Sequence, residues 1–251
     1  MMRLLFCLCL ACGLVVAGIS EGVHGEANPN VGMDGTAADG DLTVTTPAGW
    51  SDGQLGILLL YLDAGDGSTP TGWTEVSGSP FGSGTAKMCI FRKFLDIATD
   101  STAVTTISGL SGAAGGTIFT FNGADGTTPV EAVGQDSSMT SGATAYGYSV
   151  NTVTDSAWAL ICCGWGDNGV AAAAKFDGST DGVTDYAAGG SSVGDDVGYG
   201  VGYKPFNTAG ATGVGQMAAP GGGNDPWVGV VLVVKPAAAA ATTIAPGFFF
   251  R

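Results

Sequence analysis

Short apolar runs separated by glycine-rich turns constrain this chain more than any other feature of its sequence. Beyond residue 25, no segment of ten or more residues has helical periodicity, whereas apolar or alternating runs recur roughly every 8–12 residues. Gly116–Asn122 alternates between polar and apolar side chains, and Leu55–Leu62 is continuously apolar, which predicts a central strand covered on both faces. We therefore expect an all-β protein, an antiparallel two-sheet β-sandwich of about ten to twelve strands.

Glycine accounts for 44 of the 251 residues, and many glycines follow aspartate, as is typical of tight turns. Because 45% of the residues are hydrophobic, this glycine content does not indicate disorder. The formal net charge of −14 arises from 22 acidic against 8 basic residues, and most of the acids are turn aspartates. Such a surface would repel nucleic acid and anionic lipid, so neither is expected as a partner.

The chain has a single histidine and few glutamates, which limits the hydrolytic mechanisms open to it. Its single histidine, His24, lies within the first 25 residues, which argues against histidine-dependent hydrolases and histidine-ligated metal enzymes. A glycosidase needs a pair of carboxylates, and beyond residue 26 the only glutamates are Glu75 and Glu131, 56 positions apart. We predict that the chain is not an enzyme and keep a secreted glycosidase as an alternative.

Residues 1–25 have the composition of a secretory signal peptide. Arg3 supplies the positive charge, Leu4–Ile19 is nearly all apolar, and Val23-His24-Gly25 offers a cleavage site. The apolar run is short for a membrane span, so we expect a secreted, extracellular chain with no span after cleavage. The alternative is a hydrophobic N-terminal arm that is buried in the fold.

Two further segments complete the expected organisation. Residues 26–236 form the β-sandwich domain, and residues 237–251 form an alanine-rich linker with an apolar tail. Phe248, Phe249 and Phe250 in this tail are costly in water, at about 25 cal/mol per Å² of exposed apolar surface. They are candidate assembly residues that dock either on their own domain or on a neighbouring subunit.

The cysteines and tryptophans are mostly expected in the core. Cys162 and Cys163 are adjacent in an apolar run, so they point to opposite faces of a strand and pack as small hydrophobic residues. A disulfide from Cys89 to either of them stays open. Trp73 and Trp227 are also expected in the core.

Two clusters are candidate binding sites. Glycan binding uses exposed aromatic rings beside carboxylate or amide groups, which selects Trp50, Trp165, Asp167 and Asn168 as candidate ligand-binding residues. Ca²⁺ is the one cofactor for which the sequence offers a candidate site.

That site is a loop with three carboxylates four residues apart, Asp177, Asp181 and Asp185. The full spacing of an EF-hand is missing from it. The alternative role of these aspartates is to cap successive turns.

Several motifs in order along residues 40–235 resemble β-sandwich modules of phage tails, fibres and other virion-surface proteins, which also occur in bacterial surface proteins. The resemblance begins with an alternating strand that leads to a tryptophan, followed by an apolar strand. A Thr-Pro-x-Gly-Trp hairpin and a further strand come next. The last motif is an aromatic strand that ends in Gly-x-Asp and is followed by x-Pro-Val-Glu. These segments are Asp41–Trp50, Leu55–Leu62, Thr69–Val76, Lys87–Leu95, Gly116–Asp125 and Thr128–Glu131.

The resemblance implies a jelly-roll-like sandwich without enzymatic activity, used for assembly, decoration or attachment. It leads us to expect a structural subunit of an extracellular or virion-surface assembly, whose partners are copies of itself or other subunits. A signal peptide departs from this pattern, because a virion protein assembled in the cytoplasm needs none. The alternative function is a glycan-binding, lectin-like adhesion module.

Overall fold

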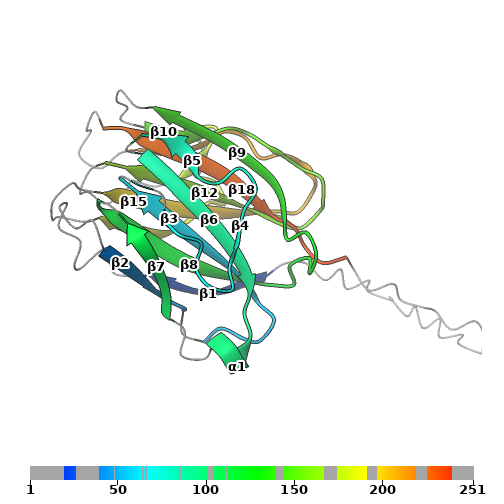
Figure 1. Ribbon diagram of the computed structural model, residues 1–251. Coiled ribbons are helices and arrows are strands. Elements are labelled where there is room, and N and C mark those ends of the chain that lie inside the picture. The colour runs from blue at the N-terminus through cyan, green and yellow to red at the C-terminus, as the bar shows by residue number, and fades with distance from the viewer. Residues whose placement is uncertain are drawn as a thin grey trace, which may run out of the picture.

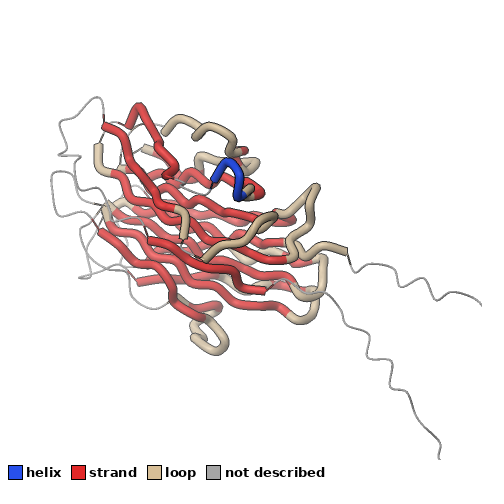
Figure 2. The backbone as a smooth tube through the Cα atoms, turned by 90° about the horizontal axis from the view of Figure 1, so that it is seen from below, coloured by secondary structure: helices blue, strands red, loops and turns tan. Residues whose placement is uncertain are grey.

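The computed structural model describes residues 20–26, 40–47, 49–63, 65, 67–84, 86–100, 104–110, 112–138, 144–166, 174–190, 197–218 and 225–238. Within these residues the chain is all-β, as expected, and its one helix is the four-residue α1 (Ile97–Asp100). Figure 2 shows that strands make up most of this backbone. No helix in the described ranges is long and apolar enough to cross a bilayer. The eighteen described strands form five antiparallel sheets, so a plain two-sheet arrangement of about ten to twelve strands is not confirmed.

The first large sheet has the strand order β1-β8-β3-β6-β4, with β5 paired to β6. Its strands are β1 (Ser20–Glu26), β3 (Leu55–Leu62), β4 (Thr74–Glu75), β5 (Phe81–Ser83), β6 (Ala86–Phe94) and β8 (Ala114–Asn122). The end of the expected signal peptide therefore forms β1, which pairs with β8, whereas residues 1–19 lie outside the described residues. Cleavage after Gly25 remains a prediction, and it would remove most of β1.

The second large sheet has the order β14-β15-β12-β18-β9 and packs face to face on the first (Figure 1). Its strands are β9 (Val130–Ser138), β12 (Ala157–Trp165), β14 (Thr184–Gly190), β15 (Gly198–Phe206) and β18 (Trp227–Val234). One cluster of buried side chains joins the two sheets, with Ile57 and Leu59 from β3 and Val228 and Val230 from β18 among its members. This cluster is the central core.

Smaller sheets cover the outer faces. β2 (Gly40–Thr45) and β7 (Val104–Leu110) cover the first large sheet, where Leu42 and Ile107 pack with Leu58 and Leu60 of β3. β10 (Thr144–Gly147), β17 (Gly215–Ala218) and β13 (Lys175–Phe176) form a sheet that covers the second, and β11 (Asn151–Thr152) pairs with β16 (Gly210–Ala211). Every residue of β3 is buried. This confirms the prediction that Leu55–Leu62 is central and covered on both faces.

The three described cysteines are buried and form no disulfide, and each lies in a different cluster. Cys162 faces the central core, whereas Cys163 faces the sheet that contains β10. Cys89 lies on the outer face of the first large sheet, under β2 and β7. The opposite orientation of Cys162 and Cys163 is confirmed, and the disulfide to Cys89 that the sequence left open is not formed.

Glycines let β10 lie directly on the backbone of the second large sheet. A Cβ at Gly147 would stand 2.7 Å from the backbone nitrogen of Val231, and a Cβ at Gly229 would overlap the backbone of Tyr146. A Cβ at Gly134 on the neighbouring strand β9 would likewise overlap Tyr148. A side chain at any of these three glycines would force the covering sheet away from β18 and β9.

Asp125 fastens the loop before β9 to the end of β18. Its Oδ1 accepts hydrogen bonds from the backbone N–H groups of Thr128 and Thr127, at 2.8 and 2.9 Å, and its Oδ2 lies 3.1 Å from Lys235 Nζ. Its own backbone N–H donates to the carbonyl of Lys235. The hydrogen bonds from Thr128 and Thr127, followed by the one from Lys235, lower the pKa of the Asp125 carboxyl from 3.8 to about 2.

We predict that Gly229→Ala lowers the free energy of unfolding by about 1–3 kcal/mol, because the methyl group overpacks the contact with β10. Urea unfolding would measure the change as a lower midpoint. Gly126→Ala is the control, since nothing lies within 4 Å of a Cβ there. Equal midpoints for the two variants would contradict the role given to Gly229.

A second prediction concerns pH. Because the folded-state pKa of Asp125 is depressed, its stabilising effect is complete above the unfolded value of 3.8 and disappears as the pH falls through about 2. Asp125→Asn should therefore lower the melting temperature at pH 7 and have less effect near pH 2. Asp181→Asn, at an exposed turn, serves as the control. A pH-independent effect of Asp125→Asn would contradict this account.

Candidate functional site

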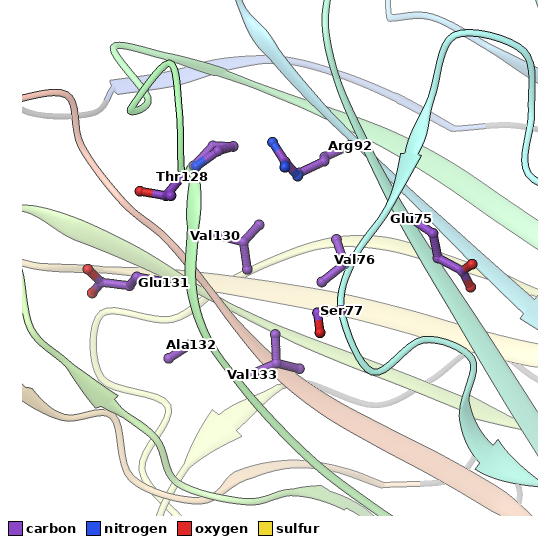
Figure 3. Close-up of a pocket in the computed structure, with 10 residues that line it drawn as sticks. Glu75, Val76, Ser77, Arg92, Thr128, Val130, Glu131, Ala132 and Val133 are labelled. Carbon is purple, nitrogen blue, oxygen red and sulfur yellow. The ribbon is translucent and has the colours of Figure 1, made fainter.

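A groove of about 470 Å³ opens between the outermost strands of the two large sheets. One wall is the segment around β4, and the other is the loop before β9 together with the first residues of β9 (Figure 3). Its size is in the range of small-ligand pockets. The residues that line it are Glu75, Val76, Ser77, Arg92, Thr128, Pro129, Val130, Glu131, Ala132 and Val133.

The strand order explains why the groove lies there. β4 is the last strand of the first large sheet, and β9 is the last strand of the second. Farther along β9, the two sheets meet where the backbone N–H of Gly82 on β5 donates to Gln135 Oε1 on β9 at 3.2 Å. Beside β4, which is only two residues long, the sheets stay apart and leave the groove open.

A β-bulge in β9 sets the direction of Glu131. Val130 pairs with Val234 and Ala132 pairs with Val233, so Glu131 is the extra residue in the register. Its carboxylate accepts hydrogen bonds from Val153 N–H at 3.1 Å and from Thr154 Oγ1 at 2.7 Å. Glu131 therefore holds the turn before β12.

The two glutamates considered for a glycosidase line the same groove, although they are far apart in the sequence. Their carboxylates nevertheless turn in opposite directions, Glu131 toward its turn and Glu75 outward from the other wall (Figure 3). A glycosidase needs both carboxyl groups to face one sugar bond. This arrangement does not place Glu75 and Glu131 around a shared substrate.

Arg92 is the residue that sequence reasoning missed. It is half-buried on β6, and its guanidinium points into the gap between the two walls (Figure 3). The signal was present in the sequence, because Ala86, Met88 and Ile90 alternate along the core face of β6 and Arg92 occupies the next position of that face. The alternation identifies an arginine where an apolar residue is expected.

The structure separates the two tryptophans among the candidate glycan-binding residues. Trp165 is fully buried in the core, so it presents no ring to a ligand, which corrects the expectation of an exposed ring at this position. Trp50 is half-buried near the start of β3. Tyr61, near the other end of β3, packs against Gly164, the neighbour of Trp165. Asp167 and Asn168 lie outside the described residues.

The candidate Ca²⁺ loop is described only in part. Asp177 and Asp181 are exposed, and Asp177 Oδ1 accepts a hydrogen bond from the backbone N–H of Val214, 37 positions along the chain, at 2.8 Å. Asp185 belongs to β14, and its side chain is not among those described. Over the described ranges, no group of three or more His, Cys, Asp or Glu side chains is arranged to hold a metal ion.

Phe248, Phe249 and Phe250 lie outside the described residues. Trp73 and Trp227 are buried, which confirms their expected place in the core.

Burial suppresses the ionisation of the other buried groups. It raises the pKa values of the Cys162 and Cys163 thiols, so neither forms a thiolate nucleophile at neutral pH. Burial, and then the charges of Asp63 and Asp225, raise the pKa of the Tyr61 hydroxyl.

No family model, no curated protein and no solved structure matches this chain.

Proposed function

We propose that this chain is a non-enzymatic structural subunit of an extracellular or virion-surface assembly, in which it associates with copies of itself or decorates a larger particle. We also propose that the fold is a two-sheet, jelly-roll-like sandwich with additional covering strands. It also includes secretion and the docking of Phe248–Phe250 on a neighbouring subunit.

The observation that supports association is the open groove between β4 and β9. Two motifs that carry the resemblance to virion-surface modules end at this groove, since Glu75 and Val76 lie on one wall and Thr128 to Glu131 on the other. Over the described residues β9 pairs with β18 alone, so its other edge is open to an added strand. Open sheet edges beside a groove are suited to binding an extended segment of another chain.

The geometry of the glutamates also favours binding over catalysis. Glu131 is engaged in two hydrogen bonds that hold a turn, and Glu75 faces away from it (Figure 3). A pair of carboxylates with these orientations supports the walls of a groove better than it supports hydrolysis.

A glycan-binding module is the second candidate, and exposed aromatic rings favour it. Tyr148 is 57% exposed and Tyr146 is 37% exposed, on or next to β10. Tyr146 pairs in register with Gln216 of β17, which pairs with Lys175 of β13, so one row across this sheet carries an aromatic, an amide and a cationic residue. A glycan array probed with the full chain and with Tyr148→Ala would test this role, and equal signals from both would contradict it.

We predict that Ser77→Trp weakens self-association at least tenfold. Ser77 is exposed on the groove wall, so an indole there fills the groove without entering the core. Sedimentation velocity over a range of concentrations measures the dissociation constant. Ser51→Trp, at an exposed serine outside the groove lining, is the control and should associate like the unaltered chain. A chain that stays monomeric at every concentration would rule out self-association.

Removal of residues 242–251 tests the tail by the same measurement. If Phe248–Phe250 dock on a neighbour, the shortened chain should associate more weakly than the full chain. Unchanged association would remove the tail from the proposal and leave the groove.

We also predict different effects of substituting the two glutamates. Glu131→Gln should lower the free energy of unfolding by about 1 kcal/mol, because one of its two accepted hydrogen bonds is lost. Glu75→Gln, at an exposed position, should stay within about 0.5 kcal/mol of the unaltered chain. Urea unfolding distinguishes them. Loss of a measured glycosidase activity in both variants, with stability unchanged, would instead support the enzyme alternative.

A further inference from the structure

Arg92 lies on the face of β6 whose other positions carry apolar side chains. On β6 the core face carries Ala86, Met88 and Ile90, and Phe94 packs against the same cluster two residues after Arg92. In the register Arg92 lies opposite Ile57 of β3 and Thr74 of β4. Arg92 is therefore a cation at the edge of the central core. It is one of only 8 basic residues in the chain.

The charge of Arg92 is not neutralised within the described part of the chain. No hydrogen bond or ion pair joins its guanidinium to any described residue, and the carboxylates of Glu75 and Glu131 point away from it (Figure 3). Two other half-buried cations are paired: Lys93 contacts Asp100 and Lys235 contacts Asp125. A half-buried charge without a partner is unfavourable, so the position of Arg92 calls for an anion from outside the chain.

The surroundings of Arg92 define the kind of anion. The groove supplies apolar contacts from Val76, Val130 and Val133 and hydroxyl groups from Ser77 and Thr128. A carboxylate can accept two parallel hydrogen bonds from one guanidinium, which gives strength and direction. A more highly charged anion such as phosphate is less suitable, because Arg92 is the single cation that lines the groove and the chain has a net charge of −14.

The strand edges indicate how the carboxylate is carried. The groove runs between β4 and β9, the outermost strands of their sheets among the described elements. An extended peptide can add its backbone to such an edge and place alternate side chains in the groove. We propose that this groove is a binding site for an extended acidic peptide segment, whose carboxylate pairs with Arg92 while the residues beside it pack on the valines. This proposal rests on the proposed role in assembly and names the chemistry of the partner segment.

Fluorescence anisotropy with labelled peptides tests the proposal on the full chain. The probe is a blocked Thr-Val-Asp-Val-Thr peptide, and its Thr-Val-Asn-Val-Thr counterpart removes only the charge. We expect the aspartate peptide to bind at least tenfold more tightly than the asparagine peptide. Equal binding of both peptides, or binding of neither, would overturn the proposal.

Substitutions of Arg92 locate the binding. Arg92→Gln should weaken the aspartate peptide at least tenfold and leave the asparagine peptide unchanged, and Arg92→Lys should restore part of the difference. Lys175→Gln is the control, because Lys175 is also half-buried but lies on β13, away from the groove. An equal effect of Lys175→Gln would indicate a general charge effect and overturn the assignment. If inorganic phosphate displaces the aspartate peptide better than acetate does, the assignment of a carboxylate site is also overturned.

A stability measurement separates binding from a structural role. Because the charge of Arg92 is unpaired, Arg92→Leu should abolish binding of the aspartate peptide while the urea midpoint stays the same or rises. A lower midpoint together with lost binding would assign Arg92 to the fold and overturn the proposal. If the peptide binds as expected but the chain does not self-associate, the site stands and self-association fails. If the chain self-associates but Arg92→Gln changes neither self-association nor peptide binding, self-association stands and the peptide site fails.

Discussion

The layered arrangement of this structure depends on two strands whose side chains are apolar on both faces. Every residue of β3 (Leu55–Leu62) and of β18 (Trp227–Val234) is buried. One face of each strand packs in the central core, and the other face must be covered as well, because exposed apolar surface costs about 25 cal/mol per Å². The sheet of β2 and β7 covers β3, and the sheet of β10, β17 and β13 covers β18. The layered arrangement therefore follows from these two strands.

Covering both faces moves the available surface to the edges. The large sheets have little exposed face left for a ligand, and among the described strands β4 and β9 each lie at one end of a large sheet. The groove between them contains the half-buried and unpaired Arg92. The same constraint that builds the core thus places a cation beside an open strand edge, where the proposed peptide segment would have access to both.

The sequence was most informative where a local pattern dictates the environment. Continuous apolarity predicted that Leu55–Leu62 is covered on both faces, and adjacency predicted that Cys162 and Cys163 face different clusters. It was least informative where neighbours distant in the chain decide. Trp165 ends an apolar strand and could have reached a loop, but the packing buries it completely. Glu131 was considered for its chemistry, whereas a bulge in β9 turns it toward Thr154, where it holds a turn.

The sequence by itself determined the all-β class, the turns at Asp-Gly pairs, the scarcity of cations and the burial of the apolar strands, because these depend on side-chain polarity and backbone preference at neighbouring positions. Only the tertiary structure decided that the described strands form five sheets, that β4 and β9 border the same groove, and that Glu75, Arg92 and Glu131 line it. These outcomes depend on strand order and on a register shift. Both are set by packing between segments that are far apart in the chain, and no local pattern records them.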